Sequence, residues 1–216
     1  MAVVLIVAAG RGERLGSEQP KALVPLAGRP MVEWSVAHAR EAGATVVVAM
    51  PDGFDAPAGT IRADGGRTRS HSVRNALAVA PEDDQVVVHD AARPLADAEL
   101  FARTLAALED SDAAIAAVRI VDTVKEADAN GRVKRTLDRS LLWSVQTPQA
   151  FRREVLERAL DVPDDILEAA TDDAWLVERV GGSVRLVEAS RANLKVTTVE
   201  DVRVAEAGLR SLAGST

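Results

Sequence analysis

The sequence of 216 residues contains no cysteine, which excludes a disulfide framework and any zinc site built on cysteine. Its three histidines, His38, His71 and His89, are far apart in the chain, which disfavours a histidine metal cluster. No apolar run approaches the roughly 20 residues needed to cross a bilayer. The apolar start, MAVVLIVAAG, has no basic segment before it and is typical of a buried strand, not a signal peptide. We therefore expect a cytoplasmic protein that does not associate with membranes.

Basic residues are outnumbered by acidic ones, 26 to 33. The formal net charge of -7 disfavours nucleic acid as a partner, but leaves a local cationic pocket for a small anion open. The chain has 4 lysines and 22 arginines, so a lysine inside a motif suggests selection for a compact point charge. The length suits one sizeable core, and we expect residues 1–216 to form a single domain.

Apolar strand-like runs alternate with segments of helical spacing, which predicts an α/β sheet with helices on both faces. We expect strands at residues 2–8, 45–50, 60–63, 85–90, 113–121 and 183–188. We expect helices at residues 30–42, 68–80, 97–109, 151–160, 172–180 and 199–212.

Residues 119–139 depart from this alternation, because two polar, strand-like segments flank an Asp-Ala-Asn-Gly turn. This pattern predicts a β-hairpin that projects from the body as an arm at about residues 119–142. An isolated hairpin is marginally stable in water, so the arm should pack on something. A second subunit and the surface of its own chain are equally compatible with the sequence.

A glycine-rich segment, AAGRGERLGSEQPKAL, follows the first strand. It fails the Walker A pattern, and its third glycine comes one place late for the dinucleotide fingerprint. It does place two cations, Arg14 and Lys21, at the carboxyl end of the first strand, where open α/β sheets bind ligands. The alternative is that both are ordinary solvated charges.

Three further segments carry polar groups to loop positions. Residues 64–72, DGGRTRSHS, open a helix and suit a phosphate or a base edge, although an ordinary helix cap would look the same. In HDAARP, Asp90 could bind a metal or a ligand hydroxyl and Arg93 a phosphate, or the two could simply brace a loop beside a satisfied core histidine, His89. In NLKVT, Lys195 follows a strand, either as a functional cation or as a solvated one.

Together these segments resemble the 2-C-methyl-D-erythritol 4-phosphate cytidylyltransferase family of the non-mevalonate isoprenoid pathway. The motifs that carry the resemblance occur in family order over almost the whole chain: AAGxGxR with PK, DGGxxRxxSV, HDAARP, DTVK, QTPQ, TDDA and NLKVT. The sequence departs from the family pattern at His71, where a polar or acidic residue is usual, and at Trp175, where a small residue is usual.

The resemblance implies a Rossmann-like mixed, mostly parallel sheet, CTP and Mg²⁺ as nucleotide and cofactor, and a homodimer formed through the hairpin arm. It implies three groups of site residues. Catalysis would fall to Arg14, Lys21 and Lys195. CTP would be held by Ala8, Ala9, Gly10, Gly66, Arg69 and Ser72. The sugar-alcohol phosphate would be held by Asp90, Arg93 and Thr171, with Thr123 and Arg139 from the partner's arm, and Asp90 could also bind the metal.

The chemistry agrees with the residue types. A phosphate monoester has a second pKa near 6, so the nucleophile is already ionised and needs no general base. Catalysis then requires mainly positioning and fixed positive charge between two polyanions. Two rivals remain open: a cytidylyltransferase for another alditol phosphate such as ribitol 5-phosphate, and a dinucleotide-dependent oxidoreductase, in which Asp52 would bind the ribose.

Overall fold

The computed structural model describes residues 2–10, 12, 15 and 19–213. Its centre is a seven-stranded sheet with the strand order β11-β7-β10-β6-β1-β4-β5. The strands are β1 (Ala2–Val7), β4 (Thr45–Met50), β5 (Ile61–Asp64), β6 (Gln85–Asp90), β7 (Ala113–Arg119), β10 (Trp143–Arg152) and β11 (Val184–Glu188). Only β10 runs antiparallel to its neighbours within this sheet, so the expected mixed, mostly parallel sheet is confirmed.

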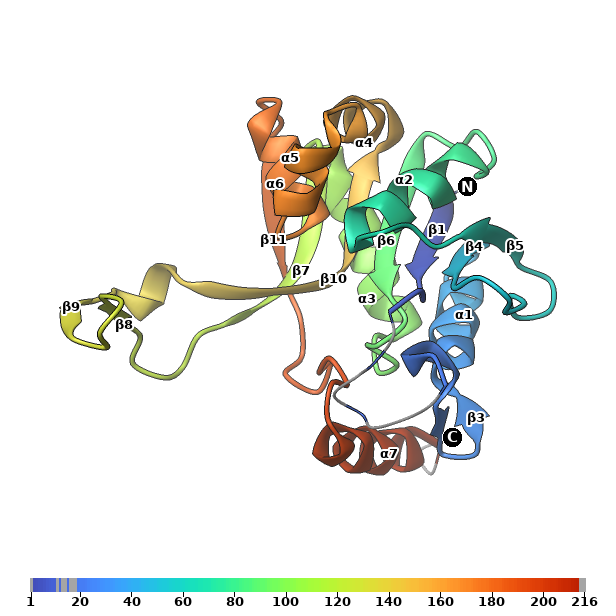
Figure 1. Cartoon of the computed structure of the whole chain (residues 1–216), viewed down its shortest axis with the longest axis horizontal. Coiled ribbons are helices and arrows are strands. Elements are labelled where there is room, and N and C mark those ends of the chain that lie inside the picture. The colour runs from blue at the N-terminus through green and yellow to red at the C-terminus, as the bar shows by residue number, and fades with distance from the viewer. Residues whose placement is uncertain (1, 11, 13–14, 16–18, 214–216) are drawn as a thin grey trace.

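Helices cover both faces of the sheet (Figure 1). They are α1 (Met31–Glu41), α2 (Arg69–Ala78), α3 (Ala98–Ala106), α4 (Arg153–Leu160), α5 (Asp164–Ala169), α6 (Asp173–Arg179) and α7 (Val199–Ala213). Helices α2, α4, α5 and α6 pack on one face, and α1 and α3 pack on the other. Among the described residues no helix is long and apolar enough to span a membrane.

Strand β1 shows why the first apolar run forms a central strand. Successive side chains of a strand point to opposite faces. Val3 and Leu5 accordingly enter the core under α2 and α4, whereas Val4 and Ile6 enter the core under α1 and α3. An uninterrupted apolar run is thus what a strand buried on both faces requires.

The chain reverses its direction of travel across the sheet at β1. It proceeds from β1 to β4 and β5 on one side, then crosses to β6 on the other side of β1. Such a switch point leaves a crevice at the carboxyl ends of the two strands, where ligands of open α/β sheets bind. Helix α7 packs near this end through a small separate core that includes Leu26, Val196 and Leu209.

The predicted hairpin consists of β8 (Lys125–Ala127) and β9 (Val133–Thr136), which pair antiparallel around a turn that ends at Gly131. The arm extends away from the body of the molecule (Figure 1). No residue from 121 to 145 is buried, and the side chains of Val133 and Leu141 leave 60% and 76% of their surface exposed.

The sequence misplaces one helix start and misses four elements. Phe151 and Arg152, expected in a helix, end strand β10, and α4 begins at Arg153. Strand β10 was missed because Pro148 normally argues against a central strand. Here the pairing register with β7 shifts between Val145 and Gln149, so the proline falls in an irregularity of the ladder. The short helix α5 and the two-residue strands β2 (Pro25–Leu26) and β3 (Arg29–Pro30) also lacked a clear periodic signal.

Candidate active site

A cleft of about 910 Å³ opens at the switch point. It is bounded by the carboxyl ends of β1, β4 and β6, the N-terminal end of α2, and the segment before α7. Nine of the residues predicted from sequence line it: Asp90, together with Ala8, Ala9, Gly10, Lys21, Gly66, Arg69, Ser72 and Lys195. The structure thus brings together motifs from both ends of the chain.

The first loop forms one wall through its backbone. The amide of Lys21 donates to the carbonyl of Gly10 at 3.3 Å, which folds the loop back over the end of β1. Gly12 has φ of +71°, and a Cβ there would lie 2.6 Å from the Cβ of Lys21. Glycine at position 12 therefore lets Lys21 approach the loop closely. Arg14, the third predicted catalytic cation, lies outside the described residues.

The start of α2 forms the opposite wall. Thr68 caps the helix, and the hydroxyl of Ser72 donates to the carbonyl of Thr68 at 3.0 Å while accepting from the amide of Gly66 at 2.9 Å. A Cβ on Gly66 would lie 2.3 Å from the Cβ of His71, so only glycine fits there. The hydroxyl of Ser72 is therefore engaged in shaping the loop.

Asp90 lines the cleft with both carboxylate oxygens bound. Oδ1 accepts from Arg69 Nε at 2.8 Å, and Oδ2 accepts from Lys195 Nζ at 2.6 Å. Burial raises the pKa of Asp90, but the positive charges of Arg69 and Lys195 outweigh it and hold that pKa well below its usual range. Asp90 is thus a permanent anion that holds two cations at the cleft.

Asp173 is a site residue that the sequence did not identify. It is completely buried, and its Oδ2 accepts from Arg69 Nη1 at 2.6 Å. Burial raises the pKa of Asp173. The pKa of Arg69 is also raised, because the two neighbouring carboxylates overcome the cost of burying the guanidinium. Asp173 belongs to the TDDA motif, so the motif marked its position, but nothing in the sequence pairs it with Arg69.

His89 and Thr147 support Asp90 from behind. The hydroxyl of Thr147 accepts from the amide of Asp90 at 3.0 Å and donates to His89 Nδ1 at 3.0 Å. The other ring nitrogen, Nε2, donates to the carbonyl of Arg93 at 3.2 Å, which fixes the neutral tautomer. Burial lowers the pKa of His89 to about 3, so the ring is uncharged at neutral pH. His89 is thus a core residue whose two ring nitrogens are both hydrogen-bonded. This is the structural alternative that the sequence left open.

A second cavity of about 410 Å³ adjoins the cleft, and Lys195 lines both. It is cationic, because Arg93, Arg119 and Arg191 also line it, and Asp122 is the one carboxylate among its described lining residues. The guanidinium of Arg93 donates to the carbonyl of Asn193 at 2.8 Å, which holds it in this wall. The sequence predicted Arg93 here but gave no signal for Arg119 and Arg191, which come from the root of the arm and the loop after β11.

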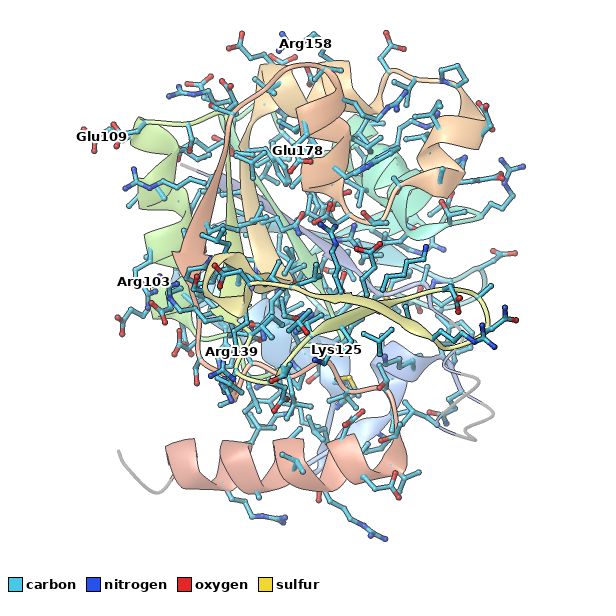
Figure 2. All side chains as sticks on the ribbon, turned by 90° about the vertical axis from the view of Figure 1, so that its left-hand side faces the viewer. Arg103, Glu109, Lys125, Arg139, Arg158 and Glu178 are labelled. Carbon is cyan, nitrogen blue, oxygen red and sulfur yellow. The ribbon has the colours of Figure 1, made fainter. Side chains whose placement is uncertain are left out.

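Three predicted substrate residues lie elsewhere in this chain. Thr123 and Arg139 are on the exposed arm, where Arg139 donates to the carbonyl of Val121 and is labelled in Figure 2. Thr171 is exposed just before α6. It is not among the described residues that line the two cavities. Trp175 is also absent from both walls. It packs against the core, with Arg179 5.0 Å from its ring centre.

No preformed metal site is evident in the described part of the chain, where no three His, Asp or Glu side chains cluster in a geometry suited to an ion. Asp90, named as a metal ligand from sequence, already has a cation on each oxygen. The positive charges of Arg69 and Lys195 disfavour a divalent ion at this carboxylate. Mg²⁺ is commonly held by only one or two carboxylates together with substrate phosphates.

Comparison with known proteins agrees with the motifs. The sequence model of a family described as 2-C-methyl-D-erythritol 4-phosphate cytidylyltransferase matches residues 2–211. Proteins of that name from Rubrobacter xylanophilus and Frankia casuarinae are 42% and 46% identical, over 95% and 94% of this chain and 94% and 79% of their own. The crystal structure of 2-C-methyl-D-erythritol 4-phosphate cytidylyltransferase from Thermus thermophilus is 34% identical, has a TM-score of 0.80, and is matched over 97% of this chain and 100% of that one.

Proposed function

The chain belongs to the 2-C-methyl-D-erythritol 4-phosphate cytidylyltransferase family, and from this we infer that it transfers CMP from CTP to 2-C-methyl-D-erythritol 4-phosphate. The products are 4-diphosphocytidyl-2-C-methyl-D-erythritol and pyrophosphate. The enzyme is a nucleotidyltransferase, which removes the dinucleotide-dependent oxidoreductase from consideration. Asp52 does line the cleft, as the oxidoreductase hypothesis required, but its position alone does not support that activity.

The observation that carries the mechanism is the position of Lys195, which lines both cavities. We propose that CTP occupies the larger cleft and the sugar-alcohol phosphate the smaller, cationic one. The attacking phosphate oxygen and the α-phosphorus would then meet beside the ammonium group of Lys195. Asp90 and Arg93, one on each side of this boundary, would hold the acceptor.

The reaction forms a bond from an acceptor phosphate oxygen to the α-phosphorus and breaks the bond to the β-phosphate, which leaves as pyrophosphate. Both reactants are anions, so repulsion is the main obstacle. Lys21 and Lys195 approach from opposite ends of the chain and would stabilise the charge on the α-phosphate oxygens. Arg14 is proposed for the same role on the basis of its motif.

CTP is proposed to enter as its Mg²⁺ complex, in which the ion neutralises part of the triphosphate charge. The cleft supports this assignment because the oxygens of Asp90 are taken by cations, leaving the phosphates as the main ligands. The prediction of Asp90 as a metal ligand thus has little support from the geometry. EDTA should stop turnover, and added Mg²⁺ should restore it.

We also propose that two copies of this single domain form a homodimer through the arm, with Thr123 and Arg139 reaching the partner's acceptor cavity. The arm supports this because it exposes apolar side chains, such as those of Val133 and Leu141, that nothing in its own chain covers within the described residues. A cytoplasmic location and the absence of nucleic-acid and membrane partners remain predictions.

A pyrophosphate-release assay tests the function directly. CTP and Mg²⁺ are supplied with 2-C-methyl-D-erythritol 4-phosphate, ribitol 5-phosphate or glycerol 3-phosphate. We expect release with the first acceptor and little with the other two. Release that favours ribitol 5-phosphate would assign the chain to a different acceptor, and no release with any of them would contradict the proposal.

A further inference from the structure

His71, one of the two positions at which the sequence departs from the family pattern, lies immediately behind the nucleotide wall. It is buried, 6% exposed, and does not itself line the cleft. Its Nδ1 is 2.7 Å from the hydroxyl oxygen of Thr68, which does line the cleft. The imidazole of His71 can therefore influence a ligand through the hydroxyl of Thr68.

The far side of the imidazole faces Asp164 at the start of α5. Nε2 lies 3.3 Å from Asp164 Oδ1, at ion-pair distance but without hydrogen-bond alignment. Asp164 is held by Arg74 Nη2 at 3.1 Å and Arg67 Nη2 at 3.3 Å, and hydrogen bonds led by that from Arg74 lower its pKa. Arg67 also pairs with Glu168. The carboxylate is therefore a fixed anion beside Nε2.

Of the two neutral tautomers of the ring, an anion beside Nε2 favours the one that carries its proton on Nε2. Nδ1 is then an acceptor, and the hydroxyl of Thr68 must donate to it. With its proton directed to His71, the oxygen of Thr68 can only accept hydrogen bonds from a ligand in the cleft. A free threonine hydroxyl could rotate and do either.

The order of strands indicates which part of the nucleotide meets Thr68. The acceptor cavity is lined from β7 and β10, Asp90 ends β6, and the loop of Lys21 follows β1. Thr68 follows β5, at the far edge of the same series. In the proposed function, the α-phosphate lies between Lys195 and Lys21. The base is then left to the wall at Gly66 and Thr68.

We propose that His71 is a positioning residue that fixes Thr68 as a hydrogen-bond acceptor at the base end of the cleft and thereby favours cytosine over uracil. Cytosine presents an amino group as a donor where uracil presents a carbonyl oxygen. This inference rests on the proposed function, since it concerns the same nucleotide site. It adds a means of base selection that depends on a side chain outside the cleft.

The test compares kcat/KM for CTP and for UTP in the same pyrophosphate-release assay. The variant His71→Leu fills a similar volume without an acceptor, and we expect the CTP to UTP ratio to fall roughly tenfold, the effect of misplacing one hydrogen bond. In a Thr68→Val background, which lacks the hydroxyl, adding His71→Leu should not change the ratio further. His38→Leu, a histidine on α1, is the matched control and should keep the wild-type ratio.

A merely structural role would lower both kcat/KM values by the same factor, and that result would overturn the proposal. If His71→Leu does not fold, Asp164→Asn serves instead, because this exposed side chain biases the tautomer of His71 and its replacement leaves the core packing intact. It should shift the ratio in the same direction, and an unchanged ratio there would again overturn the proposal. A wild-type enzyme inactive with CTP would contradict the proposed function. An active one whose ratio no variant alters would contradict only the role of His71.

Discussion

Asp90 Oδ2 accepts a hydrogen bond from Lys195 Nζ at 2.6 Å, joining residues that are 105 positions apart in the chain. Side-chain exposure is 9% for Asp90 and 42% for Lys195, so the carboxylate is buried in the wall of the cleft while Lys195 stays partly exposed. An arriving phosphate can therefore bind the ammonium group without entering the core. The carboxylate keeps Lys195 in place until then.

Gly10 and Gly66 should respond differently to the same substitution. A Cβ on Gly10 meets nothing within 4 Å in the free protein, so Gly10→Ala should leave the melting temperature unchanged. If the first loop touches the triphosphate, the added methyl group should raise the KM for CTP. Thermal unfolding and CTP kinetics on one preparation check both statements, and an unchanged KM would argue against contact between this loop and CTP.

Gly66→Ala should instead destabilise the fold itself. Its Cβ would lie 2.3 Å from the Cβ and 2.6 Å from the carbonyl carbon of His71, so the start of α2 must shift. Overpacking of this kind costs about 1–3 kcal/mol. Denaturant unfolding measures the loss, with Gly10→Ala as the matched control. Equal stability of the two variants would contradict the packing described here.

His89 should make stability depend on pH. Its pKa is lowered from 6.5 to about 3 by burial, so between these values the unfolded chain binds a proton that the folded chain does not. The contribution of the neutral ring is fully present above pH 6.5 and is lost as the pH falls toward 3. The free energy of unfolding should therefore decrease as the pH is lowered from 7 to 5.

His89→Asn removes the titrating group while keeping an acceptor for Thr147. We expect this variant to be less stable than wild type at pH 7, because a buried ring is lost. It should also show a shallower decrease in unfolding free energy between pH 7 and 5. Identical slopes for the two proteins would mean that His89 does not cause the dependence.

The sequence predicted the sheet well because a strand buried on both faces and an amphipathic helix have unmistakable periods. It missed β10 because QTPQ carries a proline and polar side chains into the middle of the sheet. Their partners, such as Asn193 for Gln146 and Asp172 for Gln149, come from distant segments. The motifs identified most of the predicted site residues that line the cleft. Pairings across the chain, such as Arg69 with Asp173 or His71 with Asp164, have no signal in a single sequence.

Arg139→Ala tests whether sites are shared between subunits. The residue is on the exposed arm, so the variant should keep the fold and mainly raise the KM for the sugar phosphate. Mixing it with Lys21→Ala gives dimers in which one of the two sites has both residues intact. Random exchange predicts recovery of about a quarter of wild-type activity. No recovery after verified subunit exchange would indicate that each site is complete within one chain.

The central claim is that cations from both ends of the chain allow two anionic substrates to react. Its most direct test is the turnover number of Lys21→Ala and Lys195→Ala at saturating CTP, Mg²⁺ and sugar phosphate, with the exposed Arg158→Ala on α4 as a control for loss of a positive charge. We predict that each lysine variant turns over roughly 10² to 10³ times more slowly than wild type, while the control is unaffected. Near-normal turnover in both lysine variants would contradict the account.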